Sequence, residues 1–290
     1  MLQDEIKRIE SEGAQSFLTS EPKRIFQEAF VDVTKKIEHP PIAISIGTHS
    51  SGTQTFPTSF ATYGNFSCII GASKSRKTFL KSLLTSVFIG GQANAYTSNI
   101  ISHRERDMYV IDIDTEQSEY HSQKVFQRVC RMVGSNYPFY KPFALRPYTF
   151  TQRVQFIEYL IYESEFKDNI GLMCIDGIAD LISDINDISK ADEIIQKLMK
   201  WTHDKKMHII ANLHTNFDSK KARGHLGSFV LQKAETVAHV ERGESNMSNV
   251  SFPYSRGYPI DDFKFSINQD GIPYTENSMP IQSISDVAPF

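Results

Sequence analysis

A phosphate-binding pattern occupies residues 71–78, which read Gly-Ala-Ser-Lys-Ser-Arg-Lys-Thr. In the general form Gly-x-x-x-x-Gly-Lys-Ser/Thr, backbone N–H groups surround phosphate oxygens, and the helix that follows adds the partial positive charge of its N-terminus. The lysine reaches the β- and γ-phosphates and the hydroxyl holds Mg²⁺, so Lys77 and Thr78 take these roles. The residues expected to bind the nucleotide are Gly71, Ser73, Lys74, Ser75, Arg76, Lys77 and Thr78.

The pattern departs from its usual form at Arg76, which stands in place of the second glycine. A side chain at this tight position must find room, and its guanidinium could itself approach a phosphate. An ordinary basic turn between a strand and a helix is the alternative interpretation of the loop. A strand predicted before the loop and a helix predicted after it favour phosphate binding.

A second requirement of such a site is a carboxylate that supports the hydration shell of Mg²⁺. Asp176 follows the apolar run 171–175. The carboxyl ends of strands lie at the sheet edge where ligands bind, so Asp176 is the second candidate metal residue beside Thr78. An aspartate that caps a helix or a loop is the alternative.

A further carboxylate must polarise the attacking water, and three acidic residues stand at the end of the apolar run that begins at Tyr109: Asp112, Asp114 and Glu116. Glu116 lies just past the strand end, where it can face the γ-phosphate, and it is the candidate general base. We expect Asp112 to serve in local capping and turn hydrogen bonds. For Asp114, a local cap and a role in the site both stay open.

The apolar run 209–213 ends in His214, Thr215 and Asn216. A histidine at the end of a core strand can contact the γ-phosphate or relay its loss to a mobile loop, so we predict that His214 is a sensor. A structural histidine is the alternative. The basic segment 219–227 is expected to be a loop, which faces either single-stranded nucleic acid or solvent.

The elements that must position these residues alternate between strand and helix. Strands are predicted at 42–46, 66–70, 108–113, 143–146, 172–176, 208–213 and 236–240, and helices at 77–89, 118–133, 151–164 and 190–204. Continuous apolar strands that alternate with helices indicate an α/β fold with a mostly parallel sheet and helices on both faces. The segment 48–63 is expected to be a loop, and 248–274 to be strand-turn-strand with its turn at Asp270-Gly271.

The length of 290 residues and 40% hydrophobic content suit one large α/β domain with an extension at each end. We predict an N-terminal helical extension at 1–39, with helices at 3–12 and 21–37, an α/β domain at 40–275, and a flexible tail at 276–290.

The net charge of −3 excludes a generally basic protein that coats nucleic acid. Cys68 and Cys174 lie in apolar runs and are expected to be buried free thiols, which suits a reducing cytoplasm. The chain begins without a signal-peptide pattern and contains no apolar run near the ~20 residues that span a bilayer, so a cytoplasmic location without membrane contact is expected.

Taken in order, the motifs are the loop 71–78, Asp114-Thr115-Glu116, the segment 175–181, His214-Thr215-Asn216 and Ala-Arg-Gly-His-Leu-Gly at 222–227. This series resembles the RecA-like P-loop ATPase domain of plasmid and phage hexameric replicative helicases, above all the small stand-alone type carried by mobile elements. The resemblance covers residues 40–275 and implies ATP and Mg²⁺ as cofactors.

The resemblance also implies a homo-oligomeric ring, for example a hexamer, with the nucleotide at subunit interfaces. An arginine of the neighbouring subunit would complete each site and stabilise the charge on the transferring phosphoryl group. The candidates are Arg242 and Arg256, of which we favour Arg256; a surface ion pair is the alternative for either.

The leading functional expectation is an ATP-hydrolysing motor on single-stranded DNA in the replication of a plasmid, phage or integrated element, with other replication proteins as further partners. One alternative is a regulatory or assembly ATPase that acts with a protein partner without unwinding DNA. Because of Arg76, a nucleotide-binding scaffold with little turnover is the other alternative.

Overall fold

The computed structural model describes residues 21–216, 222–276 and 278. The chain forms two compact units, residues 1–39 and 40–290. In the first unit, residues 21–29 are helical and exposed, so the predicted helix 21–37 is wrong beyond residue 29. The predicted helix 3–12 lies outside the described residues.

The second unit is built on a nine-stranded sheet in the order β12-β11-β10-β9-β3-β8-β7-β5-β6. Six of these strands pair in parallel: β3 (Phe66–Gly71), β5 (Tyr109–Asp114), β6 (Tyr140–Ala144), β7 (Ile170–Asp176), β8 (His208–His214) and β9 (Thr236–Arg242). Every residue of β3 and β7 is buried, because these continuous apolar strands are covered on both faces. The predicted α/β fold with a mostly parallel sheet is confirmed, and only the strand expected at 143–146 is shifted, to Tyr140–Ala144.

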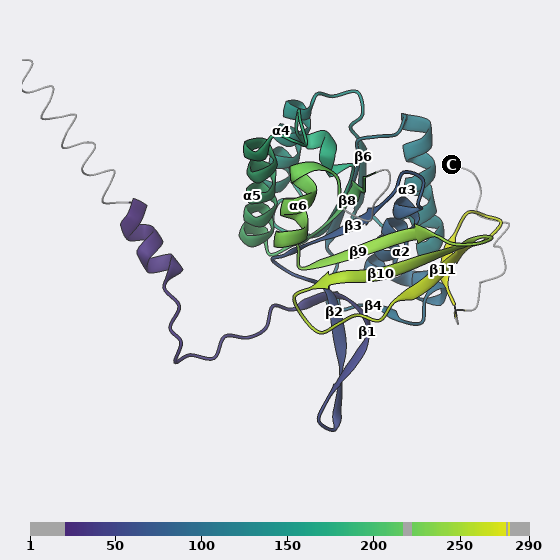
Figure 1. The fold of residues 1–290 in the computed structure, drawn as a ribbon, viewed down its shortest axis with the longest axis horizontal. Coiled ribbons are helices and arrows are strands. Elements are labelled where there is room, and N and C mark those ends of the chain that lie inside the picture. Colours follow the sequence, from purple (N-terminus) through teal and green to yellow (C-terminus); the bar gives the residue numbers. More distant parts are fainter. Residues whose placement is uncertain (1–20, 217–221, 277, 279–290) are drawn as a thin grey trace, which may run out of the picture. The chain divides into compact units, whose positions relative to one another are not determined.

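Two groups of helices cover the sheet (Figure 1). The helices are α2 (Lys77–Ile89), α3 (Glu119–Val133), α4 (Phe150–Tyr162), α5 (Ile188–Lys205) and α6 (Gly224–Lys233), with short 3₁₀ helices η1 (Gly91–Tyr96) and η2 (Ile178–Leu181). Crossovers between parallel strands are right-handed, so the direction of each step along the sheet decides which face its helix covers. The steps through α2 and α3 run one way and those through α4, α5 and α6 run the other way. The two helix groups accordingly pack into two separate apolar cores.

This topology creates a switch point beside β3. The chain leaves β3 towards α2 on one face, whereas it leaves the neighbouring strand β8 towards α6 on the opposite face. In open α/β sheets, ligands bind where the connections after two adjacent strands separate in this way. The last residues of the two strands, Gly71 and His214, are paired in register at this point.

The sheet continues through three antiparallel strands, β10 (Met247–Ser255), β11 (Phe263–Ile267) and β12 (Pro273–Thr275). The predicted strand-turn-strand character of 248–274 is confirmed, and its turn holds Gly271 at φ +74°. None of the helices in the described part of the chain is both long and apolar enough to cross a bilayer.

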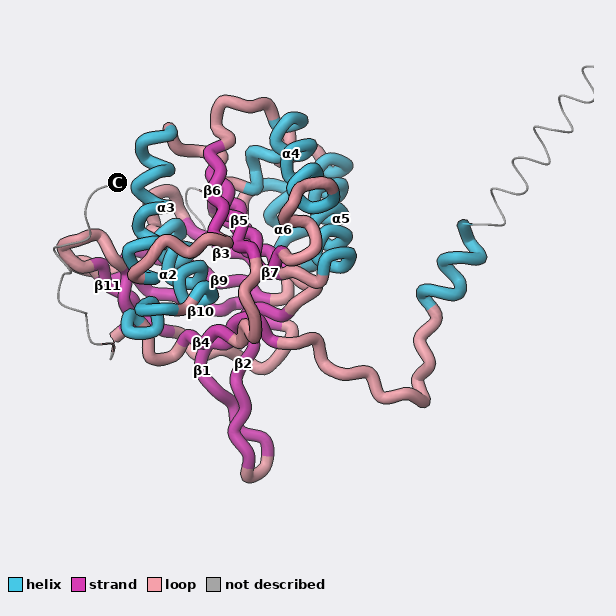
Figure 2. Tube along the Cα trace, turned by 180° about the vertical axis from the view of Figure 1, so that it is seen from behind, coloured by secondary structure: helices cyan, strands magenta, loops and turns pink. Residues whose placement is uncertain are grey.

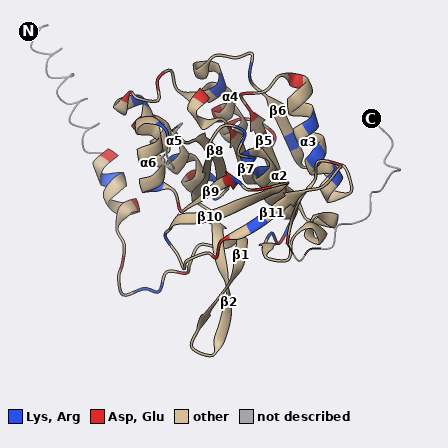
Figure 3. Cartoon of the chain, turned by 45° about the vertical axis from the view of Figure 1, so that its right-hand side comes forward, with Lys and Arg blue, Asp and Glu red and all other residues tan. Residues whose placement is uncertain are grey.

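A second, three-stranded sheet consists of β2 (Gln54–Thr62), β1 (Ile42–Ser51) and β4 (Ile100–Ser102). The strands β1 and β2 extend from the body as a hairpin (Figure 2) that carries no charged side chain (Figure 3). The loop expected at 48–63 is therefore wrong. Its serines and threonines lie on two paired antiparallel strands, and Gly52 provides the left-handed turn residue.

The segment 219–227 was expected to be a basic loop, but its second half is the first turn of α6. Gly227 packs against the backbone of Ala222 so closely that a Cβ atom at this glycine would lie 2.4 Å from the Ala222 carbonyl carbon. Glycine thus serves helix packing here. Residues 219–221 lie outside the described residues.

Candidate phosphate-binding site

Residues 71–78 form a tight turn between β3 and α2. A Cβ atom on Gly71 would lie 2.5 Å from both the Ser75 hydroxyl and the Val240 carbonyl oxygen, so no other residue fits there. Arg76, the N-cap of α2, has left-handed backbone angles of φ 77° and ψ 24°. This conformation explains why the general pattern has glycine at this position, since an L-residue loses roughly 1–2 kcal/mol in it.

The guanidinium of Arg76 is bound to the β9–β10 connection. Its Nη1 donates to the carbonyl oxygens of Asn246 (2.7 Å) and Met247 (3.0 Å) and to the Ser248 hydroxyl (3.2 Å). Burial and the nearby charge of Arg242 lower the pKa of Arg76. In this arrangement the backbone of Arg76 belongs to the loop, while its side chain anchors the beginning of β10.

Lys77 closes the loop from inside. Its Nζ donates to the carbonyl oxygens of Gly71 (2.9 Å) and Ala72 (3.0 Å) and lies 3.0 Å from Nδ1 of His214. An ammonium group has three N–H donors and no acceptor, so all three are used and Nδ1 of His214 must accept. Burial lowers the pKa of Lys77, and the carboxylates of Glu116 and Asp176 counteract this shift.

Glu116 joins the same chain of contacts. Its Oε1 lies 3.2 Å from Nε2 of His214, and because Nδ1 accepts from Lys77, Nε2 carries the proton and donates to Glu116. The side chains of His214 and Glu116 remain 32% and 41% exposed, so both are accessible from solvent. The structure thus connects three of the predicted catalytic residues, Lys77, His214 and Glu116, by consecutive hydrogen bonds.

The turn that presents Glu116 is held by Asp114. The Asp114 carboxylate accepts from the backbone N–H groups of Glu116 and Gln117, both at 2.9 Å, and from the Ser122 hydroxyl at 3.0 Å. Of the two interpretations of Asp114, the structure shows the local cap, which orients the candidate base.

Asp176 lies at the end of β7, at the same carboxyl edge of the sheet. Its Oδ1 accepts from Asn212 Nδ2 at 2.7 Å, whereas its Oδ2 is buried without a hydrogen bond and lies 3.5 Å from Lys81 Nζ. The Ser75 hydroxyl is also buried without a hydrogen-bond partner. Thr78 sits half-buried in the first turn of α2.

The side chain of Asp112 is used differently from the local capping predicted for it. It forms a fully buried ion pair with Lys81 at 2.6 Å and accepts from the Tyr140 hydroxyl at 2.7 Å. Burial alone lowers the pKa of Lys81, but Asp112 and Asp176 overcome this effect and hold it above its usual value. The capping prediction is wrong because the partner of Asp112 lies on another element. Sequence reasoning also missed Lys81, whose only signal was its place one turn after Lys77 on α2.

The two candidate arginines lie at opposite edges of the parallel sheet. Arg242 ends β9 and is near Arg76, at the edge that carries the phosphate loop. Arg256 follows Ser255, which pairs with the first residue of β9, so it lies at the amino edge. Its Nη2 donates to the Lys233 carbonyl oxygen at 2.8 Å, and both arginines are exposed.

The cysteine side chains are free thiols. Cys68 and Cys174 are buried free thiols, as predicted, and burial raises the pKa of both. No group of three or more His, Cys, Asp or Glu side chains suited to a metal ion occurs among residues 21–216 and 222–276.

Comparison of the chain with protein-family models found no match, and comparison with curated proteins found no significant similarity. The fold and the geometry show the structural class of the protein. It is an α/β protein in which a loop from strand to helix, which requires glycine at residue 71, lies at a topological switch point. The loop, a buried lysine and two carboxylate-bearing strand ends meet at one sheet edge.

Proposed function

We propose that the chain is a RecA-like P-loop ATPase that binds ATP and Mg²⁺ at residues 71–78. The observation that carries the proposal is the continuous contact from Lys77 through His214 to Glu116. It joins the phosphate-binding lysine to the candidate general base across strands that are distant in sequence. The position of the loop at the switch point between β3 and β8 supports the same conclusion.

The residues suit this ligand. Backbone N–H groups of the loop and the start of α2 would surround the phosphates, and Lys77 would exchange its carbonyl partners for phosphate oxygens. The Ser75 hydroxyl and Asp176 Oδ2 make no hydrogen bond, and the latter lies 3.5 Å from Lys81 Nζ, so a phosphate and hydrated Mg²⁺ would supply the missing hydrogen bonds. Magnesium commonly takes one or two protein ligands together with phosphate oxygens and water, which fits Thr78 and Asp176.

In the proposed reaction, Glu116 accepts a proton from water while the water oxygen bonds to the γ-phosphorus and the bond to the leaving ADP oxygen breaks. Mg²⁺ would neutralise phosphate charge. His214 contacts both Lys77 and Glu116, so it is the group that senses whether Lys77 holds the γ-phosphate.

We further propose that the ATPase works as a ring-forming motor on single-stranded DNA. This step rests on the resemblance of the motif series and on the basic residues around 220–223, which follow directly from the sensor strand β8. Arg256 is exposed, at the edge opposite its own loop, and can therefore reach the site of a neighbour.

The decisive experiment measures ATPase activity with and without single-stranded DNA, together with the mass of the assembly in Mg²⁺ and ATP. A motor shows activity that rises with DNA and an oligomer that forms with nucleotide. Lys77→Ala should abolish ATP binding and turnover. Unchanged ATPase activity in this variant would overturn the assignment of the site.

Two observations favour alternatives that the same assay distinguishes. The net charge of −3 favours a regulatory or assembly ATPase, which would hydrolyse ATP without a response to DNA. The hydrogen bonds from Arg76 to the start of β10 favour a nucleotide-binding scaffold, which would bind ATP without turnover.

A further inference from the structure

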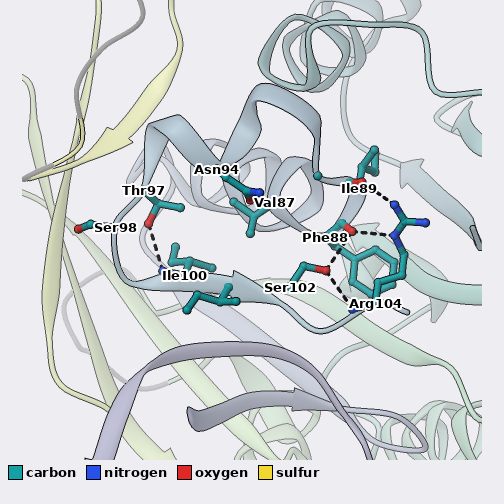
Figure 4. A pocket seen from close by; sticks show the side chains of 11 residues that line it. Val87, Phe88, Ile89, Asn94, Thr97, Ser98, Ile100, Ser102 and Arg104 are labelled. Atoms are coloured by element: carbon teal, nitrogen blue, oxygen red, sulfur yellow. Dashed lines mark hydrogen bonds between the residues drawn. The ribbon is translucent and has the colours of Figure 1, made fainter. Parts of the chain in front are cut away.

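A cavity of about 370 Å³ lies at the C-terminal end of α2 (Figure 4). It is lined by Val87, Phe88, Ile89, Gly90, Asn94, Thr97, Ser98, Ile100, Ile101, Ser102 and Arg104. The one charge among them is already engaged, since Arg104 donates to the carbonyl oxygens of Phe88 (3.1 Å) and Ile89 (2.7 Å) at the end of α2. The lining therefore offers no free charge, and its polar groups and the exposed Ile101 suit a neutral segment of chain.

One wall of the cavity is the outer edge of β4. The backbone of β4 pairs with β1 at three places. The Asn99 carbonyl oxygen accepts from Gly47 N–H, the His103 N–H donates to the Ala43 carbonyl oxygen, and Ile101 lies opposite Ser45. Backbone groups alternate along a strand, so those of Ile100 and Ser102 point away from β1. The Ile100 N–H is bound by the Thr97 hydroxyl at 3.2 Å. The Ile100 carbonyl and the Ser102 backbone remain as an edge to which an extended segment can bind.

The chain itself leaves the sheet at the rim of this cavity. The Thr275 hydroxyl accepts from the Ser98 N–H at 3.4 Å and lies 3.3 Å from the Thr97 hydroxyl. Thr97 and Ser98 both line the cavity. Ser278 donates back to the Thr275 carbonyl at 2.6 Å, so the described part of the chain ends close to Thr275 at this rim.

Residues 279–290 read Met-Pro-Ile-Gln-Ser-Ile-Ser-Asp-Val-Ala-Pro-Phe. They carry one charged side chain, Asp286, which matches the neutral lining. The stretch between Pro280 and Pro289 has no proline, so every backbone N–H in it can donate to a strand edge. Ile281 and Ile284 supply apolar side chains within easy reach of Thr275, because extended chain advances ~3.3 Å per residue.

We propose that residues 281–285 of the same chain bind this cavity as an extended segment. Their backbone bonds to Ile100 and Ser102 on the edge of β4, and Ile281 or Ile284 packs against Ile101, the exposed isoleucine of the lining. The volume supports an occupant of this size, since cavities of roughly 300–1,000 Å³ take small ligands or a few residues.

The test uses a fluorescent peptide of residues 279–290 and fluorescence anisotropy. A chain that ends at Ser278 keeps every contact described above and should bind the peptide. The full chain should bind it at least tenfold more weakly, because its own segment occupies the cavity. A peptide with Ile281→Asp and Ile284→Asp should not bind either chain. Failure of the shortened chain to bind the natural peptide overturns the proposal.

A variant of the cavity gives an independent readout. Ile101 lines the cavity yet is 49% exposed, so Ile101→Arg in the shortened chain should leave the fold intact and weaken peptide binding at least tenfold. The matched control is Ile188→Arg, which alters a 58% exposed isoleucine at the start of α5 and should bind like the parent. Equal binding by both variants overturns the assignment of the cavity.

The mass of the full chain decides which copy supplies the segment. Binding within one chain gives the same mass for the full and shortened chains at every dilution, measured without nucleotide. A concentration-dependent dimer that is lost on shortening would show that the segment comes from a second copy and would overturn the same-chain assignment. None of these measurements depends on ATP binding or hydrolysis.

Discussion

Lys77 connects residues 71–78 to His214. Its three donors are satisfied by two loop carbonyls and His214, so in the proposed function phosphate oxygens would replace contacts that already exist. His214 would then lose its partner at Nδ1 while Nε2 still faces Glu116. In this proposal, one histidine connects phosphate binding by the loop to the orientation of the candidate base.

The role of Glu116 is tested by Glu116→Gln. The amide keeps the size of the side chain and its contact with His214 but cannot accept a proton, so we expect turnover to fall about 100-fold or more, as is usual for loss of a general base. ATP affinity should change little. The measurements are steady-state ATPase rate and nucleotide titration. Glu119→Gln, on the exposed first turn of α3, is the control and should behave like the parent.

His208 gives a prediction on stability. It is fully buried in β8 and bound to the Thr62 carbonyl at 2.8 Å, and burial lowers its pKa from 6.5 to about 4. Between these values the unfolded chain binds more protons than the folded one, so stability falls as the pH decreases. The loss should reach about 3 kcal/mol near pH 4.

Urea unfolding of the parent and of His208→Gln at pH 7 and pH 4.5 measures this effect. The variant should lose less stability than the parent on acidification, while the exposed control His121→Gln should lose as much as the parent. An equal loss in parent and His208→Gln would contradict the prediction.

At the scale of elements, two basic side chains attach α2 to the sheet, one buried and one at the surface. Lys81 is buried and forms ion pairs with Asp112 on β5 and Asp176 on β7. Arg76, at the surface, connects the start of α2 to the start of β10. The phosphate loop thus lies on a helix whose position relative to three strands is set by ionic and polar contacts.

Lys81→Met tests the buried attachment. Removing one partner leaves Asp112 charged and unpaired in the core, which usually costs about 3–5 kcal/mol. The double variant Lys81→Met with Asp112→Asn removes the charge and keeps an acceptor for Tyr140, so it should recover much of the loss. Urea unfolding measures both. A cost below about 1 kcal/mol for the single variant would show that the pair contributes little.

Much of this architecture could be predicted from the sequence, because buried parallel strands such as 172–176 are continuous apolar runs that alternate with helical segments. The hairpin formed by β1 and β2 could not, since its serines, threonines and Gly52 have the composition of a loop and only pairing reveals the strands. The residues of the site were found from their positions at strand ends. The Asp112–Lys81 pair and the contacts of Arg76 with residues 246–248 join parts of the chain that no local pattern relates.

At the scale of the whole molecule, the sheet presents two unlike edges. The carboxyl edge carries the phosphate loop and Arg242, and the amino edge carries Arg256. In a closed ring each subunit presents different surfaces to its two neighbours, so an arginine remote from its own loop can complete the next site. The position of Arg256 meets this condition, whereas Arg242 lies beside its own loop.

A mixing experiment tests the arrangement. Lys77→Ala and Arg256→Ala should each be inactive alone, because each removes one half of every site. When the two variants are mixed in equal amounts, about one interface in four joins an intact loop to an intact arginine. ATPase activity should therefore return in part. Absence of recovery in a mixed assembly would rule out Arg256 as the contributed residue. The same mixture with Arg242→Ala compares the two candidates.

The helix α2 runs for 13 residues from the phosphate loop to the cavity beside β4, a distance of about 20 Å along its axis. A small molecule that occupies the cavity would not share space with the ATP that we propose to bind at residues 71–78. High ATP concentration would therefore not displace such a molecule by direct overlap. Asn94, Ile101 and Ser102 line the cavity and lie outside residues 71–78, so the molecule would contact residues that are not part of the proposed nucleotide site.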